Sequence, residues 1–279
     1  MPNTVRKVYF LSNRTAITAE TLGQSLLAQF PDVRFSSVTI PYVDNIEKTH
    51  AIVARINREN SNTRLQPIVI STMVDEEISK ILHQSVALVL DPLERFLPDL
   101  ESLLKQDSVH QTQLSHRIIN QTVYESRIDA IDFSMIHDDG GTTRSYDKAD
   151  TIIVGVSRSG KTPTCLYLAL QFGLKAANYP ITEEDIDSET LPKPINPYKN
   201  KLFGLTTNAE RLSYIRKERR PDSRYASLEQ CRKEIKAAEI MFNNFNIPYL
   251  NTTTISIEEI ATKVVELIGL NRANKPLVG

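Results

Sequence analysis

The first part of the chain alternates short apolar runs with amphipathic stretches. Short apolar runs bounded by turn residues are typical of buried strands, and apolar residues at helical spacing are typical of helices that cover them. Strands are expected at 8–12, 33–40, 67–71 and 86–90, and helices at about 18–30, 45–60, 75–83 and 92–106. Strands that alternate with helices predict a parallel sheet. We therefore expect an N-terminal α/β domain over residues 1–106, and we expect a regulatory or target-docking role for it.

A polar stretch without clear periodicity separates this region from a second alternating region. Residues 107–121 are predicted to form a linker, and residues 122–279 a second α/β domain. Its strands are expected at 151–154, 176–181, 201–206 and 248–251, and its helices at about 122–137, 161–172, 209–220, 227–245 and from Ser256 onward. The proline- and acid-rich residues 180–201 between two of the strands predict a long surface loop and a candidate lid.

One motif in the second domain carries recognisable chemistry. The string G-x-x-x-x-G-K-[ST] is matched in full by Gly155, Val156, Ser157, Arg158, Ser159, Gly160, Lys161 and Thr162. An apolar strand precedes it and a helical pattern follows it, which is the context that a phosphate-binding P-loop requires. The alternative is a chance match in a strand–turn–helix. The context favours phosphate binding.

The residue types of this motif suit a phosphate cradle. Glycine lets the backbone approach phosphate oxygens, and successive N–H groups together with a helix N-terminus attract anions. Lys161 is expected to neutralise charge on the terminal phosphates as a catalytic residue, and the Thr162 hydroxyl is expected to ligate Mg²⁺. We therefore predict a P-loop, kinase-like domain.

The class of P-loop protein is narrowed by motifs that are missing from the sequence. A guanine-specific N-K-x-D string is not present, since Lys201 and Lys275 of the two Asn-Lys pairs are not followed by the aspartate. No apolar run ending in an acidic residue follows the loop, as an ATPase motor would require. A kinase-like phosphotransferase is the interpretation that remains.

A phosphotransferase acting on a hydroxyl needs a carboxylate that accepts the proton. His137, Asp138 and Asp139 precede the loop strand by a short connection, and we predict them as catalytic residues. The alternative is a helix end followed by a solvated acidic turn. The arginine-rich stretch 211–224 either supplies a phosphate contact or forms the charged face of a helix.

Composition and charge indicate where the protein is expected to act and which partners are not favoured. The 279 residues carry 33 Lys and Arg against 34 Asp and Glu, so the net charge of −1 does not favour nucleic-acid binding. Two cysteines make no disulfide framework, and no apolar run reaches the length of a membrane span. The N-terminal residues lack the apolar core of a signal peptide. We expect a cytoplasmic protein without membrane contact.

Several strings resemble one known family. They are TAITAETLG (15–23), RIDAIDFSMIHDDG (127–140), GVSRSGKTPTCLYLAL (155–170), AANYP (176–180), LFGLT (202–206), the stretch 211–220 and RYAS (224–227). In this order, and over nearly the whole chain, they resemble the pyruvate, phosphate dikinase regulatory protein family, and in particular its phosphoenolpyruvate synthase regulatory branch.

The resemblance implies a bifunctional enzyme. One activity is a serine/threonine kinase that uses ADP as donor and inactivates phosphoenolpyruvate synthase by phosphorylating a threonine beside its catalytic histidine. The other is a phosphorylase, in which inorganic phosphate attacks the phosphothreonine, releases pyrophosphate and restores the synthase. By resemblance, residues 155–162 are the ADP-binding loop, and Mg²⁺ is the expected metal.

Some alternatives stay open at this stage. The target could instead be pyruvate, phosphate dikinase, or the chain could be a P-loop kinase of a small metabolite or a nucleotide-sensing binding protein. Relatives carry an acidic residue after the serine of the first strand, whereas Asn13 and Arg14 stand here. That departure puts target specificity in question. A homodimer is a further open possibility.

Overall fold

The computed structural model describes residues 5–63, 65–109, 121–186 and 190–269. The chain divides into two compact units, Met1–His116 and Arg117–Gly279. Each contains one four-stranded parallel sheet, so the predicted fold class of two α/β domains is confirmed. The boundary between the units falls inside the predicted linker 107–121, of which residues 110–120 lie outside the described residues.

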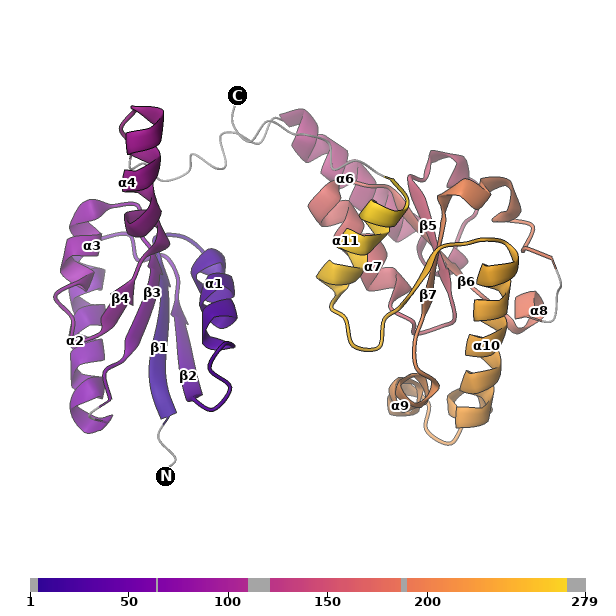
Figure 1. Cartoon of the computed structure of the whole chain (residues 1–279), viewed down its shortest axis with the longest axis horizontal. Helices are drawn as coiled ribbons and strands as arrows, with labels where there is room; N and C mark the ends of the chain where they lie inside the picture. The colour runs from indigo at the N-terminus through magenta and orange to yellow at the C-terminus, as the bar shows by residue number, and fades with distance from the viewer. Residues whose placement is uncertain (1–4, 64, 110–120, 187–189, 270–279) are drawn as a thin grey trace. The chain divides into compact units, whose positions relative to one another are not determined.

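The N-terminal unit is a sheet with helices on both faces (Figure 1). Its strands have the order β2-β1-β3-β4, and its elements are β1 (Val5–Ser12), α1 (Ile17–Leu27), β2 (Arg34–Ile40), α2 (Ile46–Thr63), β3 (Ile68–Thr72), α3 (Glu76–Leu82), β4 (Leu88–Leu90) and α4 (Pro92–Leu104). Alternate residues of β1 point to opposite faces. Val8 and Phe10 pack toward α1, whereas Tyr9 and Leu11 join a core with α2 and α3.

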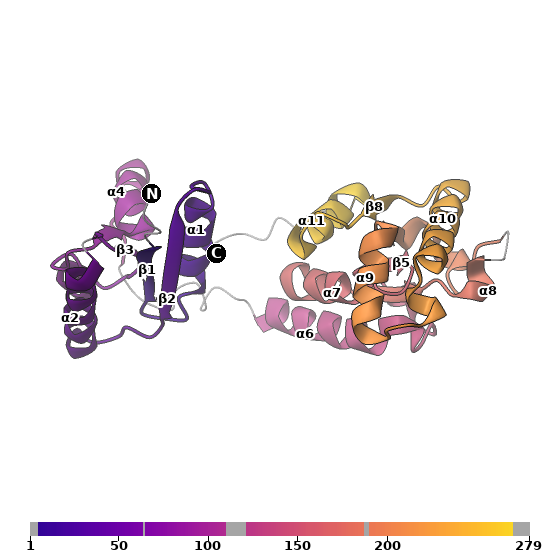
Figure 2. The ribbon, with the colours of Figure 1, turned by 90° about the horizontal axis from the view of Figure 1, so that it is seen from below.

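The C-terminal unit carries the P-loop motif on a central strand. Its strands have the order β6-β5-β7-β8, all parallel. Its elements are α6 (Gln121–Ile136), β5 (Thr151–Gly155), α7 (Lys161–Tyr167), β6 (Ala176–Pro180), α8 (Glu183–Ile186), β7 (Leu202–Thr206), α9 (Ala209–Arg219), α10 (Leu228–Asn244), β8 (Tyr249–Asn251) and α11 (Ile257–Leu267). Figure 2 shows α6, α7 and α11 together on one side of the strands, and α9 and α10 on the other. Because β5 and β7 are buried along their whole length, the end of β5 is held rigidly.

The prediction of a surface loop over residues 180–201 is wrong in part. The segment contains α8 and a 3₁₀ turn at Asn196–Lys201, and Leu191 and Ile195 are buried in the core. These two apolar side chains anchor the segment because exposing them would leave apolar surface in water. Residues 187–189 lie outside the described residues, and the lid stays a prediction.

Ile128, Ile131, Met135 and Ile136 have helical spacing in α6 and predict a buried apolar stripe, which is wrong in part. Ile128, Met135 and Ile136 are exposed, while Ala130 and Ser134 of the same helix are buried. The helix instead approaches the core through Ala130, Phe133 and Ser134, and it lies against the π-helical turn Leu168–Phe172 that continues α7. Helical spacing alone does not reveal this choice of face, since it marks a stripe without saying what covers it.

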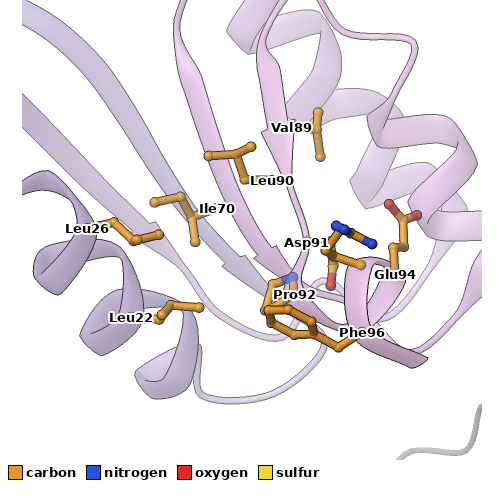
Figure 3. Close-up of a pocket in the computed structure, with 10 residues that line it drawn as sticks. Leu22, Leu26, Ile70, Val89, Leu90, Asp91, Pro92, Glu94 and Phe96 are labelled. Carbon is orange, nitrogen blue, oxygen red and sulfur yellow. The ribbon is translucent and has the colours of Figure 1, made fainter. Parts of the chain in front are cut away.

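An apolar groove of about 530 Å³ lies in the N-terminal unit, between α1 on one side and β4 and α4 on the other (Figure 3). Leu22 and Leu26 of α1 face Leu90 and Phe96 across it, and Ile70 of β3 forms part of its lining. Leu26, Leu90 and Phe96 are all exposed. The docking or regulatory role of this unit stays a prediction.

Within the described ranges, every helix is too short or too polar to cross a bilayer.

Candidate active site

The P-loop occupies the turn between β5 and α7. Arg158 and Gly160 have positive φ angles of 74° and 95°, so the backbone reverses its curvature twice before the helix begins at Lys161. At Gly155 a Cβ atom would lie 2.4 Å from the backbone oxygen of Leu205 on β7, so the close approach of the two strands requires glycine. The motif glycines are thus needed for two different reasons: conformation at Gly160 and space at Gly155.

Side chains from later in the sequence hold the loop in place. Arg216 of α9 is fully buried, and its Nη2 donates to the backbone oxygen of Ser157 at 3.1 Å and to Glu234 Oε2 at 2.6 Å. Its guanidinium lies over the ring of Tyr225, 4.1 Å from the centroid, and the Tyr225 hydroxyl is 2.8 Å from Ser157 Oγ. The Thr252 hydroxyl donates to the backbone oxygen of Ser159 at 3.2 Å.

The arginines of the stretch 211–224 therefore differ in their environment, since one is buried against the loop and others are exposed. Arg216 stabilises the loop backbone and is paired with Glu234, so its charge is largely neutralised inside the protein. Arg211, Arg219, Arg220 and Arg224 are exposed to solvent. A phosphate contact from one of these exposed arginines stays a prediction.

Lys161 is buried at the start of α7, with 4% of its surface exposed. Its Nζ donates to the backbone oxygen of Val156 at 3.0 Å, which folds the side chain back along the loop. Burial lowers the pKa of Lys161 to about 8, although the nearby Asp139 and Asp138 oppose this shift. An anion beside this amine would restore its preference for the charged form.

The acidic turn before β5 meets the helix that follows the loop. The Thr162 hydroxyl donates to Asp138 Oδ1 at 2.8 Å, and Nδ2 of Asn178 donates to the same oxygen at 2.6 Å. Asn178 Nδ2 also lies 3.1 Å from Thr162 Oγ1 and 3.4 Å from Asp139 Oδ1. Asp139 and Gly140 have φ angles of 47° and 68°, and this tight turn carries the two carboxylates to the edge of β6.

His137, the third residue predicted from this segment, is placed differently. It is buried, its ring stacks on Phe133 with centroids 4.0 Å apart, and its Nδ1 lies 2.7 Å from the Phe133 backbone oxygen. Its backbone oxygen accepts a hydrogen bond from the backbone N–H of Asn178. The structure therefore brings together Asp138, Asp139, Lys161 and Thr162, whereas the ring of His137 packs into the core beside them.

Four residues that bind the site together were not predicted from the sequence: Asn178, Tyr225, Glu234 and Thr252. Asn178 could have been predicted from the sequence, because an amide inside an otherwise apolar buried strand needs a hydrogen-bonding partner. Arg216 was predicted only as one of several basic residues, and its pairing with Glu234 depends on how α9 packs against α10.

The site fits a magnesium ion that is held mainly by its substrate. Mg²⁺ is usually bound by one or two protein oxygens together with phosphates and water, rather than by a cage of side chains. The described part of the chain has no group of three or more His, Cys, Asp or Glu side chains arranged for a metal. Thr162 and Asp138 offer a hydroxyl and a carboxylate side by side, which is the donor set that such an ion requires.

The fold and the site define a P-loop protein of the kinase-like α/β class. Residues 8–265 match the family model described as kinase/pyrophosphorylase. The chain is 51% identical over 267 residues to a protein of Legionella pneumophila (strain Corby) named "Putative phosphoenolpyruvate synthase regulatory protein", covering 96% of this chain and 98% of that relative. A protein of the same name from Marinobacter nauticus is 49% identical with the same coverage. The chain therefore belongs to the kinase/pyrophosphorylase family, and the resemblance seen in the sequence is confirmed.

The two motif glycines give a test of the loop geometry. Gly155→Ala is expected to destabilise the C-terminal unit more than Gly160→Ala, because the first adds a clash with the backbone of β7 and the second adds only conformational strain of about 1–2 kcal/mol. Urea unfolding monitored by circular dichroism measures both free energies. A larger loss for Gly160→Ala would contradict the close approach of β5 and β7.

Proposed function

We propose that this chain is a bifunctional regulator of phosphoenolpyruvate synthase. In one direction it transfers the β-phosphoryl group of ADP to a threonine of the synthase and inactivates it. In the other, inorganic phosphate removes that phosphoryl group as pyrophosphate and restores activity. The support comes from relatives of 49–51% identity named for regulation of this synthase, from the kinase/pyrophosphorylase family, and from the P-loop beside a carboxylate pair.

The observation that carries the proposal is the hydrogen bond between Thr162 and Asp138. This bond places the carboxylate of Asp138 beside Thr162, the last residue of the proposed phosphate cradle, which lies 24 positions later in the chain. A kinase needs these two features at one point: an anion cradle for the donor and a base for the attacking hydroxyl. The loop and the carboxylate meet at the carboxyl end of β5, and this supports the proposal because ligands bind at that end of the strands in parallel α/β folds.

In the kinase direction, the backbone N–H groups of the loop hold the donor phosphates, and Lys161 carries the compensating positive charge. The threonine oxygen forms a bond to the β-phosphorus of ADP as the bond from that phosphorus to the α–β bridging oxygen breaks, and AMP leaves. The threonine proton passes to a carboxylate, for which Asp138 is the best placed. A bound Mg²⁺ supplies neutralisation of the phosphate charge.

The phosphorylase direction uses the same groups. An oxygen of inorganic phosphate forms a bond to the phosphorus of phosphothreonine, the bond from that phosphorus to the threonine oxygen breaks, and pyrophosphate results. The attacking phosphate gives up its proton to the carboxylate, and the resulting carboxylic acid passes a proton to the departing threonine oxygen. Both reactions need one cradle for a group of two linked phosphates, so a single loop serves both.

The direct test is labelling of purified synthase. Wild-type chain with ADP labelled at the β-phosphate is expected to place the label on a threonine of the synthase, and added phosphate is expected to release it as pyrophosphate. Lys161→Ala should lose both activities. Labelling from ATP but not from ADP, or labelling of a small metabolite alone, would contradict the proposal. Labelling of pyruvate, phosphate dikinase in preference to the synthase would contradict the target.

The two carboxylates of the acidic turn form a matched pair. Asp138→Asn is expected to lower kcat by about 10²–10⁴-fold in both directions, because it removes the proposed base. Asp139→Asn should have a smaller effect, since Asp139 makes only a 3.4 Å contact to Asn178 and is more exposed. Single-turnover kinetics measures both rates. Equal losses would contradict the assignment of the base to Asp138, and a larger loss for Asp139→Asn would assign the base to Asp139.

The buried amine predicts a pH dependence of nucleotide binding. Since burial lowers the pKa of Lys161 to about 8, the free protein carries this charge only below that pH. The Kd for ADP, measured by calorimetry without metal, should be constant below about pH 8 and rise by up to about tenfold per pH unit above it. Lys161→Arg keeps its charge throughout, so its Kd should not rise in this range. A flat profile for the wild type would contradict the role of Lys161.

A further inference from the structure

Asn178 is a buried polar residue in the middle of β6. Its neighbours Ala176, Ala177 and Tyr179 are all buried apolar or aromatic side chains, and Asn178 itself is fully buried. Its amide nitrogen lies within hydrogen-bond distance of Asp138 and Thr162. Asn178 thus joins three separate elements: the turn before β5, the helix after the P-loop, and the adjacent strand.

The orientation of the amide follows from its neighbours. Nδ2 is 2.6 Å from Asp138 Oδ1, and a flipped amide would place an oxygen against that carboxylate oxygen. Among the described residues, Asn178 Oδ1 is buried and has no hydrogen-bond partner. A buried acceptor without a partner costs free energy, so the site retains this amide for what its nitrogen donates.

The Asn178 amide orients the Thr162 hydroxyl by taking up one of its lone pairs. A hydroxyl has one proton to donate and two lone pairs that accept. The Thr162 proton is donated to Asp138, and one lone pair accepts from Asn178 Nδ2, which leaves one lone pair for a cation. The amide therefore fixes the rotation of the hydroxyl and the direction of its remaining lone pair.

The same count applies to Asp138. Its Oδ1 accepts hydrogen bonds from both Thr162 and Asn178. In the described part of the chain, no hydrogen bond to its Oδ2 is found. The carboxylate is thus oriented by two donors on one oxygen, while the second oxygen is left to accept a proton or to bind water on a metal.

We propose that Asn178 is a positioning residue of the phosphotransfer site, which orients the Thr162 hydroxyl toward Mg²⁺ and leaves Asp138 Oδ2 as the proton acceptor. This inference rests on the proposed function and adds a residue to it. An uncharged donor is required here, because a carboxylate would repel Asp138 and an apolar side chain would remove one of the two hydrogen bonds that orient the hydroxyl.

Two substitutions separate positioning from packing. Asn178→Leu keeps the approximate volume and removes the donor, and Asn178→Ala removes both. Thr151→Val is the matched control, since Thr151 is also a buried polar residue of this sheet, but it bonds the Lys201 backbone oxygen at the opposite end of β5. The variants are compared in the full-length chain by urea unfolding, by calorimetric Kd for ADP in EDTA and in Mg²⁺, and by kcat for threonine labelling.

Both Asn178 variants are expected to keep the Kd for ADP in EDTA within about twofold, because the cradle and Lys161 are unchanged. Both should lose about 10–100-fold of the Mg²⁺-dependent gain in affinity and of kcat, which is the usual effect of removing an outer partner of a metal ligand. Thr151→Val should keep the Mg²⁺ effect and kcat.

The inference is overturned if Asn178→Leu retains both the Mg²⁺ effect and kcat. It is also overturned if both variants lose ADP binding equally with and without Mg²⁺, since that pattern indicates a structural role. The proposed function fails separately, and this inference with it, if the wild-type chain neither binds ADP nor labels threonine.

Discussion

The hydrogen bond from Thr162 to Asp138 is the contact on which the site depends. It joins the helix after the P-loop to the turn before the loop strand, so the proposed phosphate cradle and the two carboxylates of that turn form one unit. In many P-loop proteins the acidic partner comes from a strand later in the chain. In the proposed site it comes from the turn after α6, and the edge strand β6 supplies Asn178, which bonds the same carboxylate. This explains why a search for an acidic residue downstream of the loop finds none.

A second set of contacts, made by Arg216, Glu234 and Tyr225, also holds the P-loop in place. The buried ion pair of Arg216 and Glu234 holds the Ser157 carbonyl, and Tyr225 covers the guanidinium while it bonds the Ser157 hydroxyl. A buried ion pair contributes little net stability, because the desolvation of both charges offsets their attraction. Its effect here is geometric, since a guanidinium fixed by several partners keeps the loop backbone in one conformation. A loop held by these contacts needs little rearrangement to bind phosphate in the proposed reaction.

The sequence predicted most of the fold and part of the site. Strand and helix positions followed from periodicity, and the P-loop followed from its motif and its flanks, because these depend on local residues. The contacts of Arg216 with Glu234 and of Asn178 with Asp138 did not, since they join residues 18 and 40 positions apart through tertiary packing. The sequence also did not predict that Leu191 and Ile195 are buried, or that the apolar stripe of α6 is largely exposed. Burial depends on what packs against an element and not only on the pattern of its own residues.

The central claim is that one cradle, closed by Thr162 and Asp138, carries the transferred phosphoryl group. A crystal structure of the chain with ADP and Mg²⁺ tests it most directly. The account predicts the β-phosphate within the backbone N–H groups of residues 155–162, the metal on Thr162 Oγ1, and Asp138 still bonded to Thr162. A nucleotide whose β-phosphate lies away from this loop, or an acidic turn separated from Thr162, would contradict it.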